Sequence, residues 1–147
     1  MNDLPDKAIS MKLTQLIYAS QPFGFDEGAL AGILSSARHH NKRNHVTGSL
    51  ICRSDLFLQM LEGDRDIVEA TYARILRDSR HVDVKQLCAR DARERLFANW
   101  DMRHDPMRSW MWSRDEVRAG AARKASAVEA LGVFQRVAAE PYEPPPL

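Results

Sequence analysis

The segment Phe57-Leu58-Gln59-Met60-Leu61-Glu62-Gly63 constrains the fold more than any other part of the chain. Four of its first five residues are large and apolar and a glycine ends the run, which predicts a buried strand. Alternate residues of a strand share a face, so Gln59 would lie between Phe57 and Leu61. A buried amide without a partner costs about 1–3 kcal/mol, so we expect a polar group opposite Gln59. A neighbouring backbone group or a partly solvated face would also satisfy it.

The composition fits a soluble globular protein of one domain with a terminal extension, since 44% of the 147 residues are hydrophobic. With a net charge of only +1, the protein has no overall electrostatic field that would attract nucleic acid or a membrane surface. No apolar run approaches the ~20 residues that span a bilayer, and residues 1–7 lack the pattern of a signal peptide. We therefore expect a cytoplasmic protein without a nucleic-acid or membrane partner.

The sequence lacks the usual catalytic and metal-binding motifs. It has no G-x-S-x-G, P-loop, H-E-x-x-H or G-x-G-x-x-G pattern, and its five histidines do not follow metal-ligand spacing. Cys52 and Cys88 form no CxxC pair and are expected to be small buried residues. The sequence thus predicts a protein that is not an enzyme and binds no metal.

Hydrophobic periodicity predicts five strands and two long helices in one domain. The strands are expected over residues 12–19, 45–52, 57–63, 82–89 and 96–103. The helices would follow the capping residues Asp26 and Asp64. The order β-α-β-β-α-β-β predicts a ferredoxin-like α+β fold with both helices on one face of the sheet.

The C-terminal part of the chain is expected to form helices that cover the other sheet face. That face is also apolar, with Ile17, Ile51, Leu56, Leu58 and Met60. One helix would begin at Ser113, and a second would have an apolar stripe of Val128, Leu131, Phe134 and Ala138. These helices or a partner subunit would cover the face. The chain then divides into a leader (1–11), a central domain (12–105), a C-terminal helical cap (106–140) and a Pro-rich tail (141–147).

An ordered set of polar and aromatic residues spans positions 12–104. It comprises Tyr18, His40-Asn41, Thr47-Gly48, Gln59, Arg77-Asp78-Ser79-Arg80-His81 and Phe97-Ala98-Asn99-Trp100-Asp101-Met102. Each member alone has an ordinary structural explanation, such as a half-buried strand tyrosine or a polar residue ending a helix. Their order and spacing together resemble the BLUF domain, a blue-light sensor that binds FAD. The resemblance makes residues 12–105 the flavin-binding domain.

The resemblance implies a role for each matching residue. Tyr18 and Gln59 match the photoactive pair, and Asn41 matches the asparagine that bonds the pyrimidine edge of the flavin. Lys42 follows where some members have a second asparagine. The remaining cofactor contacts would be Leu34 and Ile75 on the ring faces and Asp78, Arg80 and His81 near the ring edge, ribityl chain and phosphate. Trp100 and Met102 match the residues of signal output, and either could lie nearer the flavin. FAD is the expected cofactor, with FMN or riboflavin also compatible.

The family's mechanism implies that blue light drives electron and proton transfer from Tyr18. Gln59 would then be left rotated or tautomerised, and its altered hydrogen bond would shift the flavin absorption to the red. About 40 residues follow the sensor, too few for a typical catalytic domain. We therefore expect output through a signalling partner, or through a homodimer formed by the second sheet face with Trp110 and Trp112. The alternative is a light-insensitive, ferredoxin-like module that binds a ligand or protein.

Overall fold

The computed structural model describes residues 13–24 and 26–142. The expected leader (1–11), Lys12 and most of the Pro-rich tail lie outside these residues. The elements run in the order β1 (Leu13–Pro22), α2 (Glu27–Asn44), β2 (Thr47–Arg53), β3 (Leu56–Asp64), α3 (Arg65–Leu76), β4 (His81–Ala92), β5 (Arg103–Pro106), α4 (Arg114–Arg118) and α5 (Ala127–Ala139).

A five-stranded sheet with the strand order β4-β1-β3-β2-β5 forms the centre of the molecule. The pairs β1–β3, β1–β4 and β2–β3 are antiparallel, whereas β5 lies parallel to β2. This arrangement confirms the predicted ferredoxin-like α+β fold. In the β1–β3 pair Tyr18 stands directly opposite Gln59, so the central strands themselves bring the two expected photoactive residues together.

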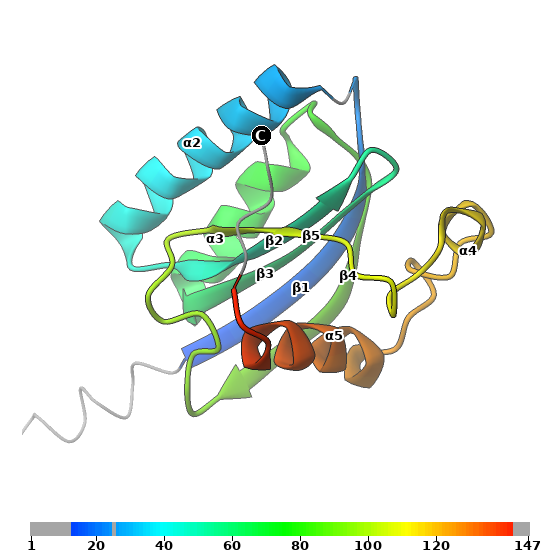
Figure 1. The fold of residues 1–147 in the computed structure, drawn as a ribbon. Coiled ribbons are helices and arrows are strands. Elements are labelled where there is room, and N and C mark those ends of the chain that lie inside the picture. Colours follow the sequence, from blue (N-terminus) through cyan, green and yellow to red (C-terminus); the bar gives the residue numbers. More distant parts are fainter. Residues whose placement is uncertain (1–12, 25, 143–147) are drawn as a thin grey trace, which may run out of the picture.

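The sheet has two apolar faces, and each is covered by helices (Figure 1). On one face Leu16 and Tyr18 pack with residues of α2 and α3. On the other, Ile17 and Ala19 pack with Phe134 and other residues of the C-terminal part. The period-two alternation of β1 therefore predicted both faces correctly, and α5 covers the second face.

Local capping signals explain where the helices begin. The carboxylate of Asp26 accepts the backbone N–H of Ala29 at the start of α2, and Asp64 accepts that of Asp66 at the start of α3. Both short-range predictions are confirmed. Ser113 and Ser126 each begin a helix with a capping box.

Gly48 in β2 stands where only glycine fits. A Cβ at this position would lie 1.9 Å from the backbone oxygen of Met60. The backbone N–H of Gly48 also donates to the carbonyl of Trp100 at 3.2 Å. The close approach of β2 to β3 is therefore one physical reason for the Thr47-Gly48 pair.

The expected strand over residues 96–103 is wrong. Residues 96–102 form turns and bends, and β5 begins only at Arg103. The backbone N–H groups of Leu96 and Phe97 donate to the Glu62 carboxylate rather than to a strand. The backbone N–H of Trp100 then donates to the backbone carbonyl of Phe97 in a tight turn. Side-chain anchoring thus overrides the strand propensity of this aromatic-rich segment.

The predicted stripe on α5 needs one correction. Val128 is 81% exposed, whereas Ala130, Phe134 and Val137 are fully buried against the sheet. Leu131 and Ala138 are only partly buried at the edge of the contact. The tail helix therefore meets the sheet through a face rotated from the expected one, centred on Phe134.

Replacing Phe134 with alanine should lower the free energy of unfolding by about 3–5 kcal/mol, because a fully buried aromatic ring would leave a cavity. Val128→Ala on the same helix is the matched control and should change it by less than about 0.5 kcal/mol. Urea unfolding followed by circular dichroism measures both. Equal stability of the two variants would contradict the packing of α5 on the sheet.

Candidate functional site

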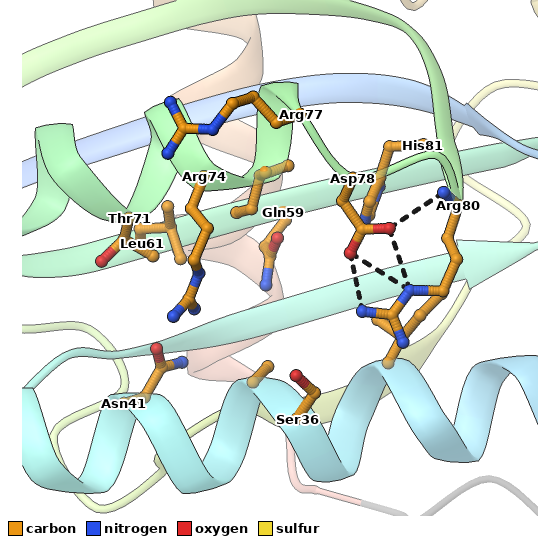
Figure 2. Close-up of a pocket in the computed structure, with 13 residues that line it drawn as sticks. Ser36, Asn41, Gln59, Leu61, Thr71, Arg74, Arg77, Asp78, Arg80 and His81 are labelled. Carbon is orange, nitrogen blue, oxygen red and sulfur yellow. Dashed lines mark hydrogen bonds and ion pairs between the residues drawn. The ribbon is translucent and has the colours of Figure 1, made fainter.

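A cavity of about 360 Å³ lies between α2 and α3 above the sheet (Figure 2). Its apolar lining comes from both helices and from β3, through Ile33, Ala37, Leu61 and Ile75. The amides of Gln59 and Asn41 lie within this apolar lining. The cavity thus has aliphatic walls and a few polar groups, the usual pattern of a small-molecule site.

Gln59 lines the cavity and is hydrogen-bonded to Tyr18 and Met102, which lie beside it. The phenol of Tyr18 donates a hydrogen bond to Gln59 Oε1, and Gln59 Nε2 donates to Met102 Sδ at 3.2 Å. All three side chains are buried. The polar partner expected for the Gln59 amide is therefore Tyr18, and both ends of the amide are used.

Burial keeps Tyr18 protonated. Tyr18 is completely buried, and this desolvation, assisted by the nearby Tyr72 and Asp78, raises the pKa of its phenol well above the usual 10. Its ring lies 5.7 Å from that of Tyr72 and 5.9 Å from that of His81. The phenol therefore remains a hydrogen-bond donor across the physiological pH range.

Asn41 places a second amide at the end of α2. Its side chain is buried, and Nδ2 donates to the backbone oxygen of Asp101 at 2.7 Å. Within the described part of the chain, its side-chain oxygen has no hydrogen-bond partner. Asn41 therefore links the cavity to the segment before β5 and keeps an acceptor available for a ligand.

Asp78, Arg80 and His81 line the cavity near the end of α3, as expected. The guanidinium of Arg80 donates to both carboxylate oxygens of Asp78, and this hydrogen bonding lowers the pKa of Asp78. Burial lowers the pKa of His81, whose Nδ1 lies 3.1 Å from Ser20 Oγ. This end of the cavity therefore carries a compensated ion pair and an imidazole that is neutral at pH 7.

Three expected cofactor contacts do not line the cavity. Tyr18 is not among the lining residues and contacts Gln59 instead. Leu34 is 1% exposed and buried in the helix–sheet core, while Ile33 occupies the wall in its place. Lys42 is exposed on α2 and lines no described part of the cavity. The helical period could have found the correct wall, because Ala37 and Ile33 precede Asn41 by four and eight residues.

Trp100 and Met102 do not share a strand face, because both precede β5. Met102 is 1% exposed and contacts Gln59, whereas Trp100 is 36% exposed and its ring lies 4.8 Å from Tyr142. Met102 therefore lies at the Gln59 amide, and Trp100 lies on the outer side of the same segment.

Glu62 holds this segment in place, although its sequence pattern did not mark it as a site residue. Its buried carboxylate accepts from Gln15 at 2.8 Å, Thr47 at 3.0 Å, and the backbone N–H groups of Leu96 and Phe97 at 2.6 and 2.9 Å. The signal was a charged residue inside an apolar strand, since such a group needs compensating donors when buried.

Comparison with known proteins assigns this chain to the class of light sensors. The family described as "BLUF: Sensors of blue-light using FAD" matches residues 13–103. The chain belongs to the BLUF family, as its motifs predicted.

Relatives include the photoactivated adenylate cyclase subunit beta of Euglena gracilis, 35% identical over 61% of this chain and 11% of that protein. The blue light- and temperature-regulated antirepressor BluF of Escherichia coli K12 is 33% identical over 71% of this chain and 26% of its own length. The chain thus spans only about a tenth of the Euglena relatives that it matches.

Solved structures show the same fold. The BlsA ground state has a TM-score of 0.75 and 25% identity, covering 89% of this chain and 91% of that chain. The dark state of the BLUF protein BlrB has a TM-score of 0.71 and 26% identity, covering 88% and 98%. These matches identify the matched residues as a BLUF photoreceptor domain, which is a sensor domain and not a catalytic one.

The residues of the cavity fit the flavin that the family binds. Isoalloxazine is a flat apolar body with hydrogen-bonding groups on its rim, and the cavity offers aliphatic walls beside the amides of Asn41 and Gln59.

No described helix is long and apolar enough to cross a membrane. Within residues 13–24 and 26–142, no cluster of His, Cys, Asp or Glu could hold a metal ion.

Glu62→Gln should lower the free energy of unfolding by about 1–3 kcal/mol, because an amide cannot accept all four donors around the buried carboxylate. Glu69→Gln on the exposed face of α3 makes the same chemical change and should be nearly neutral. Denaturant unfolding compares the two variants. A neutral effect of Glu62→Gln would show that the carboxylate does not hold the segment of Leu96 and Phe97.

Proposed function

We propose that this protein is a blue-light switch that binds FAD non-covalently between α2 and α3 and signals through Gln59. The supporting observation is the continuous line from the Tyr18 phenol through the Gln59 amide to Met102. An amide has a donor end and an acceptor end, so it can hold two different bonding patterns at one position. A change of pattern would reach the segment before β5 directly.

Bound flavin would supply the absorption of blue light and a strongly oxidising excited state. Tyr18 would then give up an electron together with its phenolic proton and take both back on recombination, which leaves only the changed Gln59. Its hydrogen bond to Gln59 Oε1 provides the path for the proton. The protonated ground state that burial imposes on Tyr18 suits this role.

The lasting change would be a rotated or tautomerised Gln59. In the structure Gln59 Oε1 accepts from Tyr18 and Nε2 donates to the sulfur of Met102. Rotation of the amide exchanges these two ends and removes the N–H···S hydrogen bond. A small local rearrangement would thereby bias the position of Met102 between two states.

The signal would then pass through β5 to the C-terminal part. Arg103 follows Met102, pairs with Asp105 at 2.9 Å and donates to the backbone oxygen of Val137 at 3.3 Å. Arg108 joins Asp105 to Glu140. These contacts connect the first residue of β5 to the end of α5, which supports an output at this surface.

We infer that the receiver is an effector domain or a separate signalling protein. The relatives are named as a light-activated cyclase and as an antirepressor, so different outputs accompany similar sensors. A homodimer is also predicted, but α5 of the same chain covers the sheet face that suggested it. Light scattering at micromolar concentration tests the dimer, and a monomer would contradict it.

Gln59→Leu should abolish the red shift under blue light while flavin remains bound, because leucine fills the position without a hydrogen-bonding group. Tyr18→Phe should do the same by removing the phenol. Gln86→Leu, an exposed amide on β4, is the matched control and should retain the shift. Absorption spectra before and after illumination measure all three.

A normal red shift in Gln59→Leu would overturn the assigned switch. The same spectra test the alternative of a light-insensitive binding module. Our proposal requires a yellow protein that shifts to the red in light and recovers in the dark. A protein that stays colourless after FAD is added would favour the alternative.

Met102→Leu should change the rate of dark recovery severalfold, because it removes the sulfur that contacts Gln59 at nearly constant volume. Trp100→Phe should change that rate less, since Trp100 lies away from the amide against Tyr142. Both variants should retain flavin. Recovery of the dark spectrum after a light pulse gives the rates, and the reverse ranking would contradict this assignment.

A further inference from the structure

β4 forms one edge of the sheet, and within the described part of the chain this strand pairs with β1 alone. The first half of its outer edge is protected. Asp83 has a left-handed φ of 53°, and its carbonyl accepts a hydrogen bond from Arg123 of the C-terminal part. Register shifts also interrupt the pairing with β1 there, whereas the pairing is regular from Cys88 to Ala92. The second half of β4 is therefore the part of the edge at which another strand can pair.

Two cavities lie beside the second half of β4, one on each face of the sheet. A cavity of about 280 Å³ is lined by Thr14 of β1 and by residues of α3. A cavity of about 630 Å³ is lined by Gln15 of β1 and Gln135 of α5. Arg90 and Asp91 of β4 line both cavities. Because successive side chains of a strand point to opposite faces, a strand added beside β4 would direct one side chain toward each cavity.

The larger cavity has positive charge that no acidic side chain compensates. Within residues 13–24 and 26–142, neither Arg90 nor Arg93 forms an ion pair. Of the two carboxylates in the lining, Asp91 is paired with Arg65 at 2.7 Å, which leaves Glu94 beside two arginines. The remaining net charge is positive and favours an acidic side chain of a binding partner.

The smaller cavity lies beside a buried hydroxyl. Thr14 is 5% exposed, and among the described residues its Oγ1 has no hydrogen-bond partner. The Thr14 side chain lines the cavity, so a turn about its Cα–Cβ bond to another rotamer would direct the hydroxyl into it. An unpaired buried hydroxyl is unfavourable, and a polar side chain that enters this cavity would gain a hydrogen bond.

Gln15 connects the larger cavity to the segment before β5. Its Nε2 donates to Glu62 at 2.8 Å and to the backbone oxygen of Glu94 at 3.5 Å. The Glu62 carboxylate in turn accepts the backbone N–H groups of Leu96 and Phe97. A partner bound in this cavity would therefore lie against the beginning of the segment that the proposed switch moves.

We propose that the second half of β4 binds an extended segment of the signalling partner as an additional strand. An acidic side chain of that segment would meet Arg90 and Arg93, and a neighbouring hydroxyl side chain would enter the cavity beside Thr14. Main-chain hydrogen bonds supply affinity in this mode of binding, and the pockets for alternate side chains supply specificity. This inference rests on the proposed function, because it gives a place to the receiver that a light switch requires.

The test titrates isotope-labelled full-length protein in the dark with a capped hexapeptide, Val-Thr-Glu-Thr-Val-Thr. Its central residues place the glutamate on one face of the strand and two threonines on the other. The amide NMR signals of residues 88–92 should shift, and those of residues 81–86 should not. Arg90→Gln and Arg93→Gln should each weaken binding about three- to fivefold, as expected for a partly solvated ion pair. Lys85→Gln removes the same charge from β4 outside both cavities and should leave the affinity unchanged.

Two further peptides separate the charge contact from the strand pairing. Glutamine in place of the glutamate should weaken binding by a similar factor. A peptide that is N-methylated throughout should not bind, because it has no main-chain N–H groups to donate. Equal binding of the three peptides, no binding of the glutamate peptide, or equal losses in Lys85→Gln and Arg90→Gln would overturn this inference.

The same titration separates this inference from two other conclusions. Concentration-dependent shifts of residues 88–92 without peptide would show that a second copy of the chain occupies the edge, and would also overturn it. Absence of a red shift under blue light would instead count against the proposed function. The titration is performed in the dark, so its result does not depend on the photocycle.

Discussion

The two hydrogen bonds of the buried Gln59 carboxamide are the interactions on which the rest of the site depends. Such an amide must be satisfied at both ends, since desolvation of an unpaired polar group costs about 1–3 kcal/mol. Tyr18 satisfies the acceptor end from the neighbouring strand, and Met102 accepts from the donor end. A sulfur is a weak acceptor, so the second hydrogen bond is the weaker of the two. The amide is therefore held firmly by β1 and loosely by the segment before β5, which suits a switch with a defined output.

The segment before β5 is held by side chains rather than by strand pairing. Glu62 fixes its beginning through two backbone N–H groups, and Asn41 and Arg38 bind the backbone oxygens of Asp101 and Met102 at its end. Irregular backbone held at a few points can move with less disruption than a paired strand. The amides of Asn41 and Gln59, which line the cavity, both contact this segment, so the cavity and the segment are physically linked.

The cavity between the two helices combines an apolar and a charged lining. Its aliphatic walls come from both helices, and its charged end has the Asp78–Arg80 ion pair. Arg74 and Arg77 also line it, and neither forms an ion pair with another described residue. The cavity can therefore contact both an apolar ring and the polar groups on its rim.

The sequence by itself determined the fold class, the alternation of β1 and β3, the helix caps and the family, because these follow from local periodicity and from residue order. It also predicted Gln59, Asn41 and Ile75 as site residues, and the structure brings these three to one cavity. Only the tertiary structure decided that residues 96–102 form turns and bends, and that α5 meets the sheet through the face centred on Phe134. The physical reason is that helix rotation and loop path depend on distant contacts, such as that of Glu62 with Leu96, 34 residues away. Sequence pattern alone contains no information on which distant donor a buried carboxylate will meet.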